Sequence, residues 1–327
     1  MKAVWYETVG PAAQVLHYGE RPDPVPQAGE VRVRLITSGV NPSDVKNRSG
    51  SRGPMAFGWQ IPHSDGAGVI DAVGEGVAPS RVGERVYTWN AAWRRAEGTC
   101  AESVCLPHDQ AVALPDSMDF AAGACLGIPA MTAAHALFSD GDVAGQTVLV
   151  TGGAGAVGEI AIQLARWAGA HVIATVSNAA KGAVATAAGA HQVIDYRSAN
   201  VVDAVRAATG GAGVDRVIEV EFGGNLPVTT QIVRTGGVIA TYGSVAEPNP
   251  AIPFYPMMFA NITVRMLLVY LIGPAERARV IARLAAAMAD NALHPRIAAR
   301  FALAETAAAH EAVESGSMIG NVVIDIA

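Results

Sequence analysis

The residues with the clearest chemical use form a glycine-rich turn. Gly153-Ala154-Gly155-Ala156-Val157-Gly158 is a complete G-x-G-x-x-G string, which follows an apolar strand-like run at 147–151. Apolar residues then recur at helical spacing as far as Ala168. In this context the glycines let the backbone approach a pyrophosphate, whose charge the N–H groups at the helix N-terminus stabilise. The turn predicts a dinucleotide site that includes Gly153, Gly155, Ala156, Val157 and Gly158.

The residues after the second predicted strand indicate which dinucleotide binds. An NAD site usually carries an Asp or Glu about 20 residues beyond the motif, to hold the ribose 2′-hydroxyl. This chain has Ser177 and Asn178 there, with Lys181 one turn further on. Hydroxyl, amide and cationic donors suit a 2′-phosphate, and Tyr196, after the third strand, lies next door in a doubly wound sheet. These residues predict that the dinucleotide is NADPH. The alternative for Lys181 is that it is a solvated surface residue with no ligand. The predicted cofactor site also includes Tyr242, Gly243, Ser244, Leu268 and Asn321.

The elements that must position these residues fall into two patterns. Before residue 119 the chain has short runs with strand periodicity and glycine breaks, at 30–38, 68–73 and 84–88. From residue 120 helix-compatible segments alternate with strands at 147–151, 171–176, 193–195, 214–220 and 237–242. Such alternation predicts a parallel sheet with helices on both faces. Two helices, 275–290 and 305–315, and a strand, 321–326, are expected to end the chain.

Composition limits the classes of protein that remain. The 327 residues are 51% hydrophobic, which is enough for about two domain cores. Lys and Arg total 23 against 29 Asp and Glu, a net charge of −6 without any block of like charges. This argues against a nucleic-acid or anionic-membrane surface. Three cysteines, no signal-peptide core and no apolar run of roughly 20 residues predict a soluble cytoplasmic protein.

Several strings together resemble one superfamily. Residues 39–44 (GVNPSD), 61–70 (IPHSDGAGVI) and 82–86 (VGERV) are similar to the N-terminal domain of medium-chain dehydrogenases/reductases. Residues 127–133 (GIPAMTA), with the glycine-rich turn, resemble its NADPH:quinone oxidoreductase group, the ζ-crystallin-like proteins. The resemblance implies an α/β fold with a GroES-like catalytic domain (1–122 and 272–327) and a Rossmann domain (123–271). It also implies a small-molecule electrophile, a quinone or other α,β-unsaturated carbonyl, and usually a homodimer.

The side-chain types argue against a metal. Zinc-dependent members of the superfamily place ligands where this chain has Asn41, Ser64 and Ile128. Catalytic zinc takes three Cys, His or carboxylate ligands, which these residues do not supply. Cys100 and Cys105 form a C-x4-C pair with no partner pair, so a structural zinc lobe is not expected either.

The resemblance places Asn41 and Thr132 near the nicotinamide, where an amide and a hydroxyl can donate to a developing oxyanion. Two structural alternatives are that Asn41 caps a turn and that Thr132 bonds its own helix backbone. Lys46, where relatives often have Tyr, either binds an anionic substrate or faces solvent. His63, where relatives commonly have Gly, either donates a proton or packs as a buried histidine.

Two further readings concern the class of function. A short-chain dehydrogenase would need Tyr-x-x-x-Lys, and none of the seven tyrosines has Lys four residues on. An NADPH-binding structural or regulatory protein without turnover is the remaining alternative.

Residues 263–271 (TVRMLLVYL) predict an edge strand. As the sixth and outermost strand of the doubly wound sheet, it would expose unpaired backbone groups and apolar side chains. We therefore expect a homodimer in which this edge pairs with its two-fold copy and buries Leu267, Leu268 and Val269.

Overall fold

The structure is a computed structural model that describes residues 1–326. The chain forms two compact units, one of residues 1–128 with residues from 295 onward and one of residues 129–294. The second unit extends past the predicted return at residue 272 because helix α10 (Pro274–Ala289) packs on helix α4 (Met131–Phe138). The first unit thus combines an N-terminal and a C-terminal segment of the chain.

The first unit is built around a seven-stranded sheet with the order β14-β15-β3-β4-β5-β7, in which β6 also pairs with β3. Its strands are β3 (Glu30–Val40), β4 (Asp65–Val73), β5 (Arg85–Thr88), β6 (Ser103–Pro107), β7 (Ala111–Ala113), β14 (Ile297–Ala302) and β15 (Asn321–Asp325). A two-stranded sheet of β1 (Lys2–Trp5) and β2 (His17–Glu20) accompanies it. The helices are α1 (Ala12–Val15), α2 (Pro42–Ser49), α3 (Phe120–Gly123) and α11 (Thr306–Glu314).

Strand β3 shows why this sheet has one dry face. Val31, Val33 and Leu35 are at most 1% exposed and pack with Ile70 and other apolar residues of the neighbouring strands. The arginines between them point to the wetter side, as the alternation in the sequence predicts.

The second unit is a six-stranded sheet with the order β10-β9-β8-β11-β12-β13, and every pair is parallel. The strands are β8 (Thr147–Val150), β9 (His171–Val176), β10 (Gln192–Asp195), β11 (Val214–Glu219), β12 (Val233–Thr241) and β13 (Thr263–Met266). In chain order this is 3-2-1-4-5-6, the doubly wound order of dinucleotide-binding domains. The predicted parallel sheet is therefore confirmed.

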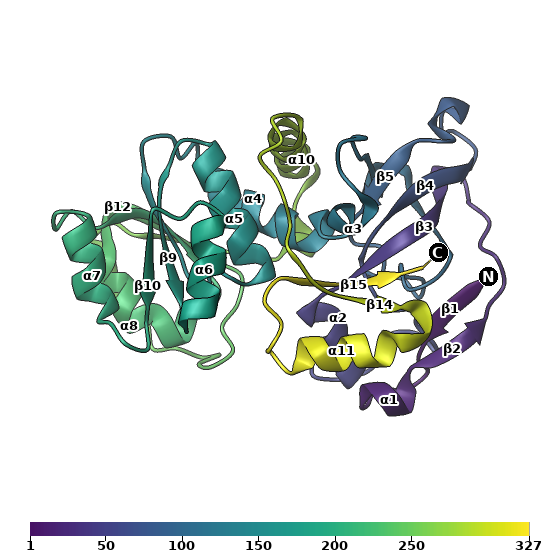
Figure 1. Cartoon of the computed structure of the whole chain (residues 1–327), viewed down its shortest axis with the longest axis horizontal. Helices are drawn as coiled ribbons and strands as arrows, with labels where there is room; N and C mark the ends of the chain where they lie inside the picture. The colour runs from purple at the N-terminus through teal and green to yellow at the C-terminus, as the bar shows by residue number, and fades with distance from the viewer. Residues whose placement is uncertain (327) are drawn as a thin grey trace. The chain divides into compact units, whose positions relative to one another are not determined.

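Helices cover both faces of this sheet. Helices α4, α5 (Ala156–Trp167) and α6 (Ala179–Ala187) lie on one face, and α7 (Val201–Ala208) and α8 (Phe222–Ile232) lie on the other (Figure 1). The core between sheet and helices includes Leu149, Ile173, Val217 and Ile239, each at most 1% exposed. The helix-compatible segment that begins at residue 120 is interrupted by a π-helical turn, Leu126–Ala130, because Pro129 lacks the N–H of a regular α-helix.

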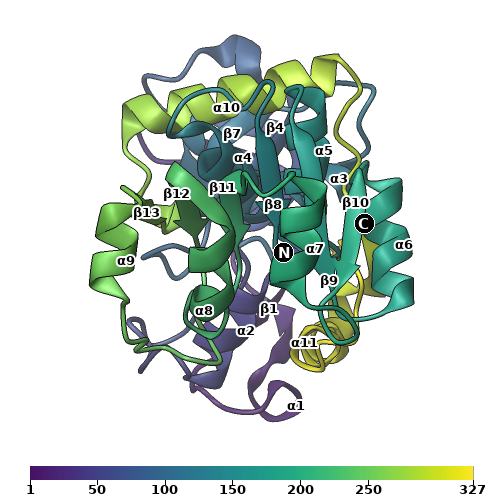
Figure 2. The ribbon, with the colours of Figure 1, turned by 90° about the vertical axis from the view of Figure 1, so that its left-hand side faces the viewer.

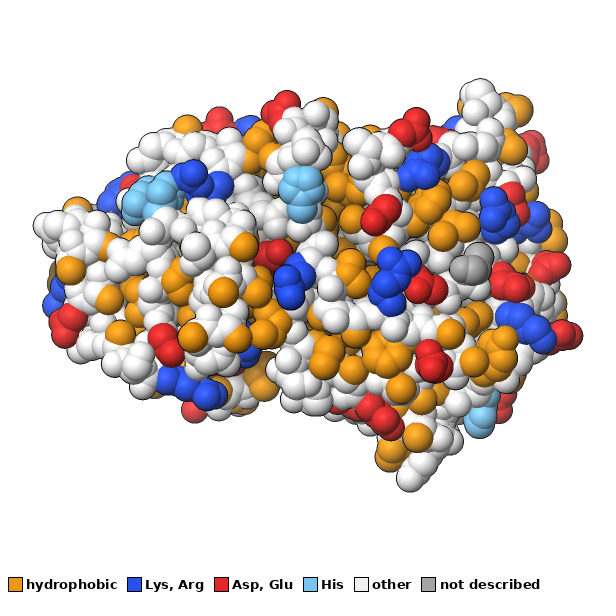
Figure 3. Space-filling view, viewed as in Figure 1, with side chains coloured by type: hydrophobic (Ala, Val, Ile, Leu, Met, Phe, Trp, Pro, Cys, Tyr) orange, Lys and Arg blue, Asp and Glu red, His pale blue; other side chains and the backbone are white. Residues whose placement is uncertain are grey.

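The edge of the sheet differs in detail from the prediction. Strand β13 is the outermost strand, beside helix α9 (Phe254–Phe259) in Figure 2, but it ends at Met266 instead of continuing to residue 271. A 3₁₀ turn (Val269–Leu271) follows. Leu267 and Val269 are buried, whereas Leu268 between them is 44% exposed. No helix within residues 1–326 has the length and apolarity to cross a membrane. On the face drawn in Figure 3, acidic and basic side chains are interspersed.

Candidate functional site

The glycine-rich turn joins β8 to α5 and is held by a buried glutamate. Glu219 Oε1 accepts hydrogen bonds from the Thr151 hydroxyl at 2.7 Å and the Asn225 amide at 2.8 Å. Gly152 has a φ of 64°, so a residue without Cβ suits the start of the turn. A Cβ on Gly158 would lie 2.3 Å from the Gly152 carbonyl oxygen, which explains the third glycine of the motif.

The N-terminus of α5 presents free donors beside this turn. Gly155 is the N-cap, so the N–H groups of Ala156, Val157 and Gly158 have no partner within the helix. Together with the helix dipole they suit an anionic group such as a pyrophosphate. The structure thus gives the five predicted turn residues a geometry that fits a dinucleotide.

A cavity of about 490 Å³ adjoins the turn at the carboxyl ends of β8, β9, β10 and β11. In an open α/β sheet, ligands bind at this end, where the strand order reverses, here between β8 and β11. The cavity is lined by Gly152, Thr175, Tyr196, Val220 and Glu221, among others. Glu221 does not project freely, because its carboxylate accepts the backbone N–H groups of Val245 and Ala246.

The residues expected to bind a 2′-phosphate lie beside this cavity. Ser177 and Asn178 directly follow β9, and the Tyr196 N–H donates to the Val176 carbonyl at 3.0 Å. Asn178 is the N-cap of α6, and its Oδ1 accepts the Lys181 backbone N–H at 2.9 Å. The Lys181 ammonium has no bonded partner within residues 1–326. The structure brings Ser177, Asn178, Lys181 and Tyr196 together at two adjacent strand ends.

The other predicted cofactor residues have varied positions. Tyr242, Gly243 and Ser244 follow β12, and the Ser244 hydroxyl accepts the Gly223 N–H at 2.9 Å and donates to the Glu247 carbonyl at 2.5 Å. Leu268 precedes the 3₁₀ turn. Asn321 belongs to the first unit, where its side-chain amide donates to the Arg296 carbonyl at 3.1 Å. That hydrogen bond links the Asn321 side chain to the backbone at Arg296, which is a structural role.

In the first unit, two buried carboxyl groups hold Asn41. Its side-chain Nδ2 donates to Asp65 Oδ2 at 2.9 Å, and its backbone N–H donates to Asp44 Oδ2 at 2.8 Å. Asp65 Oδ2 also accepts the Ile128 backbone N–H at 2.9 Å. Asn41 occupies the N-cap position of α2, and one hydrogen of its side-chain amide is engaged by Asp65.

Burial dominates the electrostatics of this cluster. It raises the pKa of Asp44 to about 7, against the hydrogen bonds from Asn41. Burial likewise raises the pKa of Asp65 well above its usual range, although Ile128 and Asn41 donate to the carboxylate. Asp65 Oδ1 is buried and has no hydrogen-bond partner in the described chain. A Cβ on Gly127 would lie 2.2 Å from that oxygen, so the packing requires glycine there.

The remaining predicted catalytic residues are Thr132 and Lys46. Thr132 is 4% exposed on α4, and its hydroxyl makes no hydrogen bond to its own helix. The backbone-bonding alternative for Thr132 is therefore not seen. Lys46 lies on α2, and its ammonium is without a bonded partner among residues 1–326.

His63 is fully buried, and its ring contacts a second histidine. His63 Nε2 lies 2.9 Å from His310 Nε2, and His63 Nδ1 lies 2.9 Å from the Ser38 hydroxyl oxygen. Burial lowers the pKa of both rings, to about 3 for His310, where the charge of Arg48 adds to the effect. Of the two sequence alternatives, the buried, packed histidine is the one observed.

The positions that hold zinc ligands in zinc-dependent relatives do not fit zinc here. The Asn41 amide is bonded to Asp65, Ile128 offers only its backbone N–H, and Ser64 offers a hydroxyl. Residues 1–326 contain no group of three or more His, Cys, Asp or Glu side chains arranged to hold a metal ion. Catalytic zinc needs three such ligands. Cys100 and Cys105 are free and buried, without a metal-ligand set around them.

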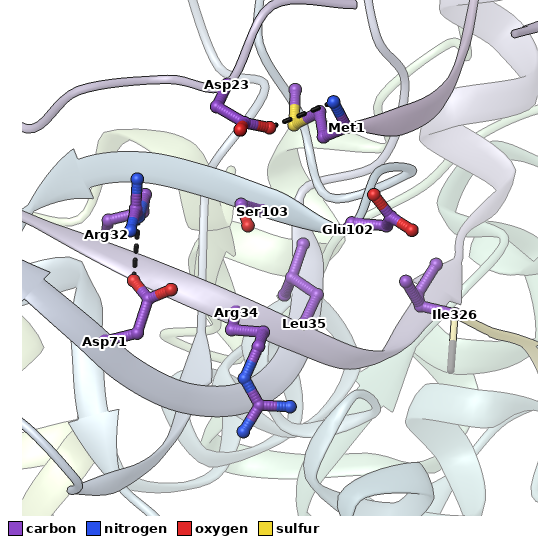
Figure 4. A pocket seen from close by; sticks show the side chains of 9 residues that line it. All are labelled: Met1, Asp23, Arg32, Arg34, Leu35, Asp71, Glu102, Ser103 and Ile326. Atoms are coloured by element: carbon purple, nitrogen blue, oxygen red, sulfur yellow. Dashed lines mark hydrogen bonds and ion pairs between the residues drawn. The ribbon is translucent and has the colours of Figure 1, made fainter. Parts of the chain in front are cut away.

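A second cavity, of about 310 Å³, lies in the first unit and is lined by Arg32, Arg34 and Leu35 of β3, among others (Figure 4). Its charges are largely paired: Arg32 bonds Asp71 at 2.8 Å, and the terminal amine of Met1 bonds Asp23 at 2.9 Å. None of the predicted site residues lines it.

Two family models match the chain. They are the alcohol dehydrogenase GroES-like domain, over residues 27–116, and the zinc-binding dehydrogenase, over residues 156–286. Quinone oxidoreductase of Sus scrofa is 32% identical over 291 residues, covering 88% of this chain and 86% of the relative. 2-Haloacrylate reductase of a Burkholderia species is 31% identical over 310 residues, 91% of each chain.

Solved structures agree with these matches. A mycobacterial quinone oxidoreductase superposes with a TM-score of 0.89 at 28% identity, and a mycobacterial protein in complex with NADPH superposes with a TM-score of 0.87 at 28% identity. Each of the two superpositions covers 100% of this chain and 100% of the solved chain. Fold and family models define a medium-chain dehydrogenase/reductase. More specifically, the chain belongs to the quinone oxidoreductase group of that superfamily, and it is an oxidoreductase.

Three residues of these networks did not stand out in the sequence. Asp65 and Glu219 had a usable signal, since each is a carboxylate at one end of a strand whose middle residues are largely buried. His310 had none, because its partner His63 lies 247 residues earlier.

Proposed function

We propose that this protein is an NADPH-dependent reductase that transfers a hydride, without a metal ion, to a quinone or another α,β-unsaturated carbonyl. The observation that carries the proposal is the cavity at the carboxyl ends of the parallel strands, which is lined by Gly152 at the start of the glycine turn and by Tyr196. The mycobacterial relative with NADPH supports the choice of cofactor. When bound, NADPH supplies a hydride from C4 of its nicotinamide.

The chain's own residues would bind the cofactor and orient the electrophile. The α5 N-terminus would hold the pyrophosphate, and Ser177, Asn178 and Lys181 would hold the 2′-phosphate. Asn41 has a second amide hydrogen that is not used toward Asp65, and Thr132 has an unused hydroxyl. As the family resemblance implies, these two donors would stabilise negative charge that develops on the substrate oxygen. The proton that completes the reduction would come from solvent.

Two kinds of electrophile are represented among the relatives, a quinone and a haloacrylate. Both contain a carbon–carbon double bond conjugated to a carbonyl, so one hydride-accepting chemistry serves both. A panel of quinones, enones and 2-haloacrylates, followed by NADPH absorbance, would rank the substrate classes. No oxidation of NADPH with any member would favour the alternative of a binding protein without turnover.

We further propose that the active form is a cytoplasmic homodimer joined along β13. Large apolar side chains are exposed on α9 and β13, including Tyr255 at 66%, Phe259 at 79% and Met266 at 71%. Helix α9 lies beside β13, the edge strand of the sheet (Figure 2), and a second copy of the chain would cover the strand edge and these side chains. The three cysteines, all free and buried, suit a reducing compartment.

A further inference from the structure

A continuous hydrogen-bonded chain runs from helix α11 to the backbone of Asp65. It passes from His310 to His63 (2.9 Å), from His63 to Ser38 (2.9 Å), and from Ser38 to Thr99 (2.7 Å). The Thr99 hydroxyl then lies 2.5 Å from the Asp65 carbonyl oxygen. All five residues are at most 1% exposed.

The carbonyl at the end fixes the direction of every bond in this chain. A carbonyl oxygen only accepts, so the Thr99 hydroxyl hydrogen is used there. The 2.7 Å separation from Ser38 needs a hydrogen between the two hydroxyl oxygens, so Ser38 donates to Thr99, which is much nearer than its other acceptor, the Asp65 carbonyl oxygen at 3.4 Å. Ser38 must then accept from His63 Nδ1–H, which leaves His63 Nε2 to accept from His310 Nε2–H.

This assignment leaves His310 Nδ1 without a proton. That atom is buried and has no hydrogen-bond partner within residues 1–326. The charge that faces His310 is the buried Arg48 guanidinium, whose partner on α11 is Glu314 at 2.5 Å. A bare nitrogen is the form that a neighbouring cation favours. The surroundings of His310 thus agree with the direction deduced from the carbonyl end.

The chain cannot deliver a proton, because it ends on a carbonyl oxygen that has none to release. It can hold the segment to which it is bonded. Thr99 also donates its backbone N–H to the His63 carbonyl at 2.9 Å, so residues 63 to 65 are fixed at both ends. The carboxylate of Asp65 is the group that accepts from Asn41.

The backbone at His63 adopts a conformation that is unfavourable for a residue with a side chain. Its φ of 77° lies in the left-handed region, which is uncommon for a residue with a Cβ. A Gly at this position would relieve the strain. A histidine retained there in a fully buried place points to a use for its two nitrogens.

We propose that His63 and His310 are positioning residues: through Ser38 and Thr99 they fix the backbone at Asp65 and so aim the Asn41 amide. The role of Asn41 in catalysis rests on the proposed function, whereas the hydrogen-bonded chain does not.

Histidine ¹⁵N spectra of the full chain test the bonding directly. At neutral pH the expected result is a neutral His63 protonated on Nδ1 and a neutral His310 protonated on Nε2, assigned with single-histidine variants. A His63 protonated on Nε2, or an imidazolium at either position, would overturn the proposal.

Thr99→Val and Thr99→Ser test the link to Asn41. The first removes the hydroxyl at nearly constant volume, and the second keeps it. Thr99→Val should shift the Asn41 side-chain amide signals and lower kcat about 10- to 100-fold, with NADPH affinity within about twofold. Thr99→Ser should restore both. Unchanged Asn41 signals and unchanged kcat in folded Thr99→Val would overturn the proposal.

A second pair of variants covers the case in which Thr99→Val does not fold. His310→Gln retains an N–H donor toward His63, and His310→Leu does not. His310→Leu should shift the Asn41 amide signals and His310→Gln should preserve them; equal spectra for the two would contradict the inference. If the wild type reduces no electrophile while the spectra behave as expected, only the proposed function fails.

Discussion

Asn41 Nδ2 and Asp65 Oδ2 are joined by a buried hydrogen bond of 2.9 Å. The bond orients the Asn41 amide, which is a hydrogen-bond donor. It also makes the donor dependent on a carboxyl whose surroundings raise its pKa.

Replacing Asn41 tests the amide donor. Asn41→Ala should lower kcat about 100-fold, the effect of removing one oxyanion donor, and change NADPH affinity little. Steady-state kinetics and NADPH fluorescence titration measure the two quantities. Thr132→Val should show the same split, with Thr132→Ser as its control. Equal losses of kcat and NADPH affinity would place either residue in cofactor binding instead.

Lys181 tests the choice of cofactor. Its ammonium is unpaired at the start of α6, so Lys181→Ala should remove one charge-assisted contact, worth about 1.5–3 kcal/mol. NADPH binding should weaken roughly 10- to 100-fold and NADH binding should stay nearly the same. Lys2→Ala, which removes a lysine on β1, is the matched control variant. A wild type that prefers NADH would refute the assignment.

Two glycines of the turn should respond differently to alanine. A Cβ on Gly158 would meet the Gly152 carbonyl oxygen at 2.3 Å, whereas on Gly155 it would meet that oxygen at 3.3 Å. Gly158→Ala should therefore lower the free energy of unfolding by about 1–3 kcal/mol. Gly155→Ala should change stability less and weaken NADPH binding, because Gly155 allows close approach of the pyrophosphate. Denaturant unfolding and titration separate the two effects, and the reverse pattern would count against this turn as the pyrophosphate site.

The histidine pair predicts acid sensitivity. The folded-state pKa of His310, about 3, lies below its usual value of 6.5, so only the unfolded chain takes up a proton between these values. This contribution to stability is complete above pH 6.5 and is lost as pH falls toward 3. The stability of the wild type should fall more steeply than that of His310→Gln, by up to about 1.4 kcal/mol per pH unit. Asp44 and Asp65, whose pKa values are raised, contribute the opposite slope in both proteins. Parallel curves from urea unfolding at several pH values would argue against two neutral buried rings.

The exposed edge predicts the oligomeric state. Phe259→Asp together with Met266→Lys should convert a dimer to monomers, as measured by light scattering at micromolar concentration. Tyr18→Asp, on β2 of the other unit, should leave the mass unchanged. A wild type with the mass of one chain would contradict edge pairing. Leu268, which the sequence predicted to lie on this edge strand, lies beyond the end of β13 at Met266.

Local patterns predicted much of the second unit. The alternation of apolar strands and helices gave β9 with its observed bounds, and the glycine string gave the start of α5. Strand β13 was predicted too long, because an apolar run does not reveal where pairing stops and a 3₁₀ turn begins. Helix α2 was missed although Pro42 at its first position is a helix-start signal.

Non-local contacts account for what the sequence did not show of the site. Asn41 was singled out, but its partner Asp65 is 24 residues away and was treated only as part of a family motif. The His63–His310 pair depends on the return of the chain's end to the first unit. Neither segment has a sequence periodicity that indicates this contact.

The most direct test of the central claim uses NADPH deuterated at C4 of the nicotinamide and protein dialysed against a chelator. With an enone from the active part of the panel, mass spectrometry should find one deuterium on a carbon of the reduced product, and metal analysis should find no stoichiometric zinc. Tight binding of NADPH with no deuterium transfer to any quinone or enone, or transfer only after zinc is added, would contradict a metal-free hydride-transferring reductase.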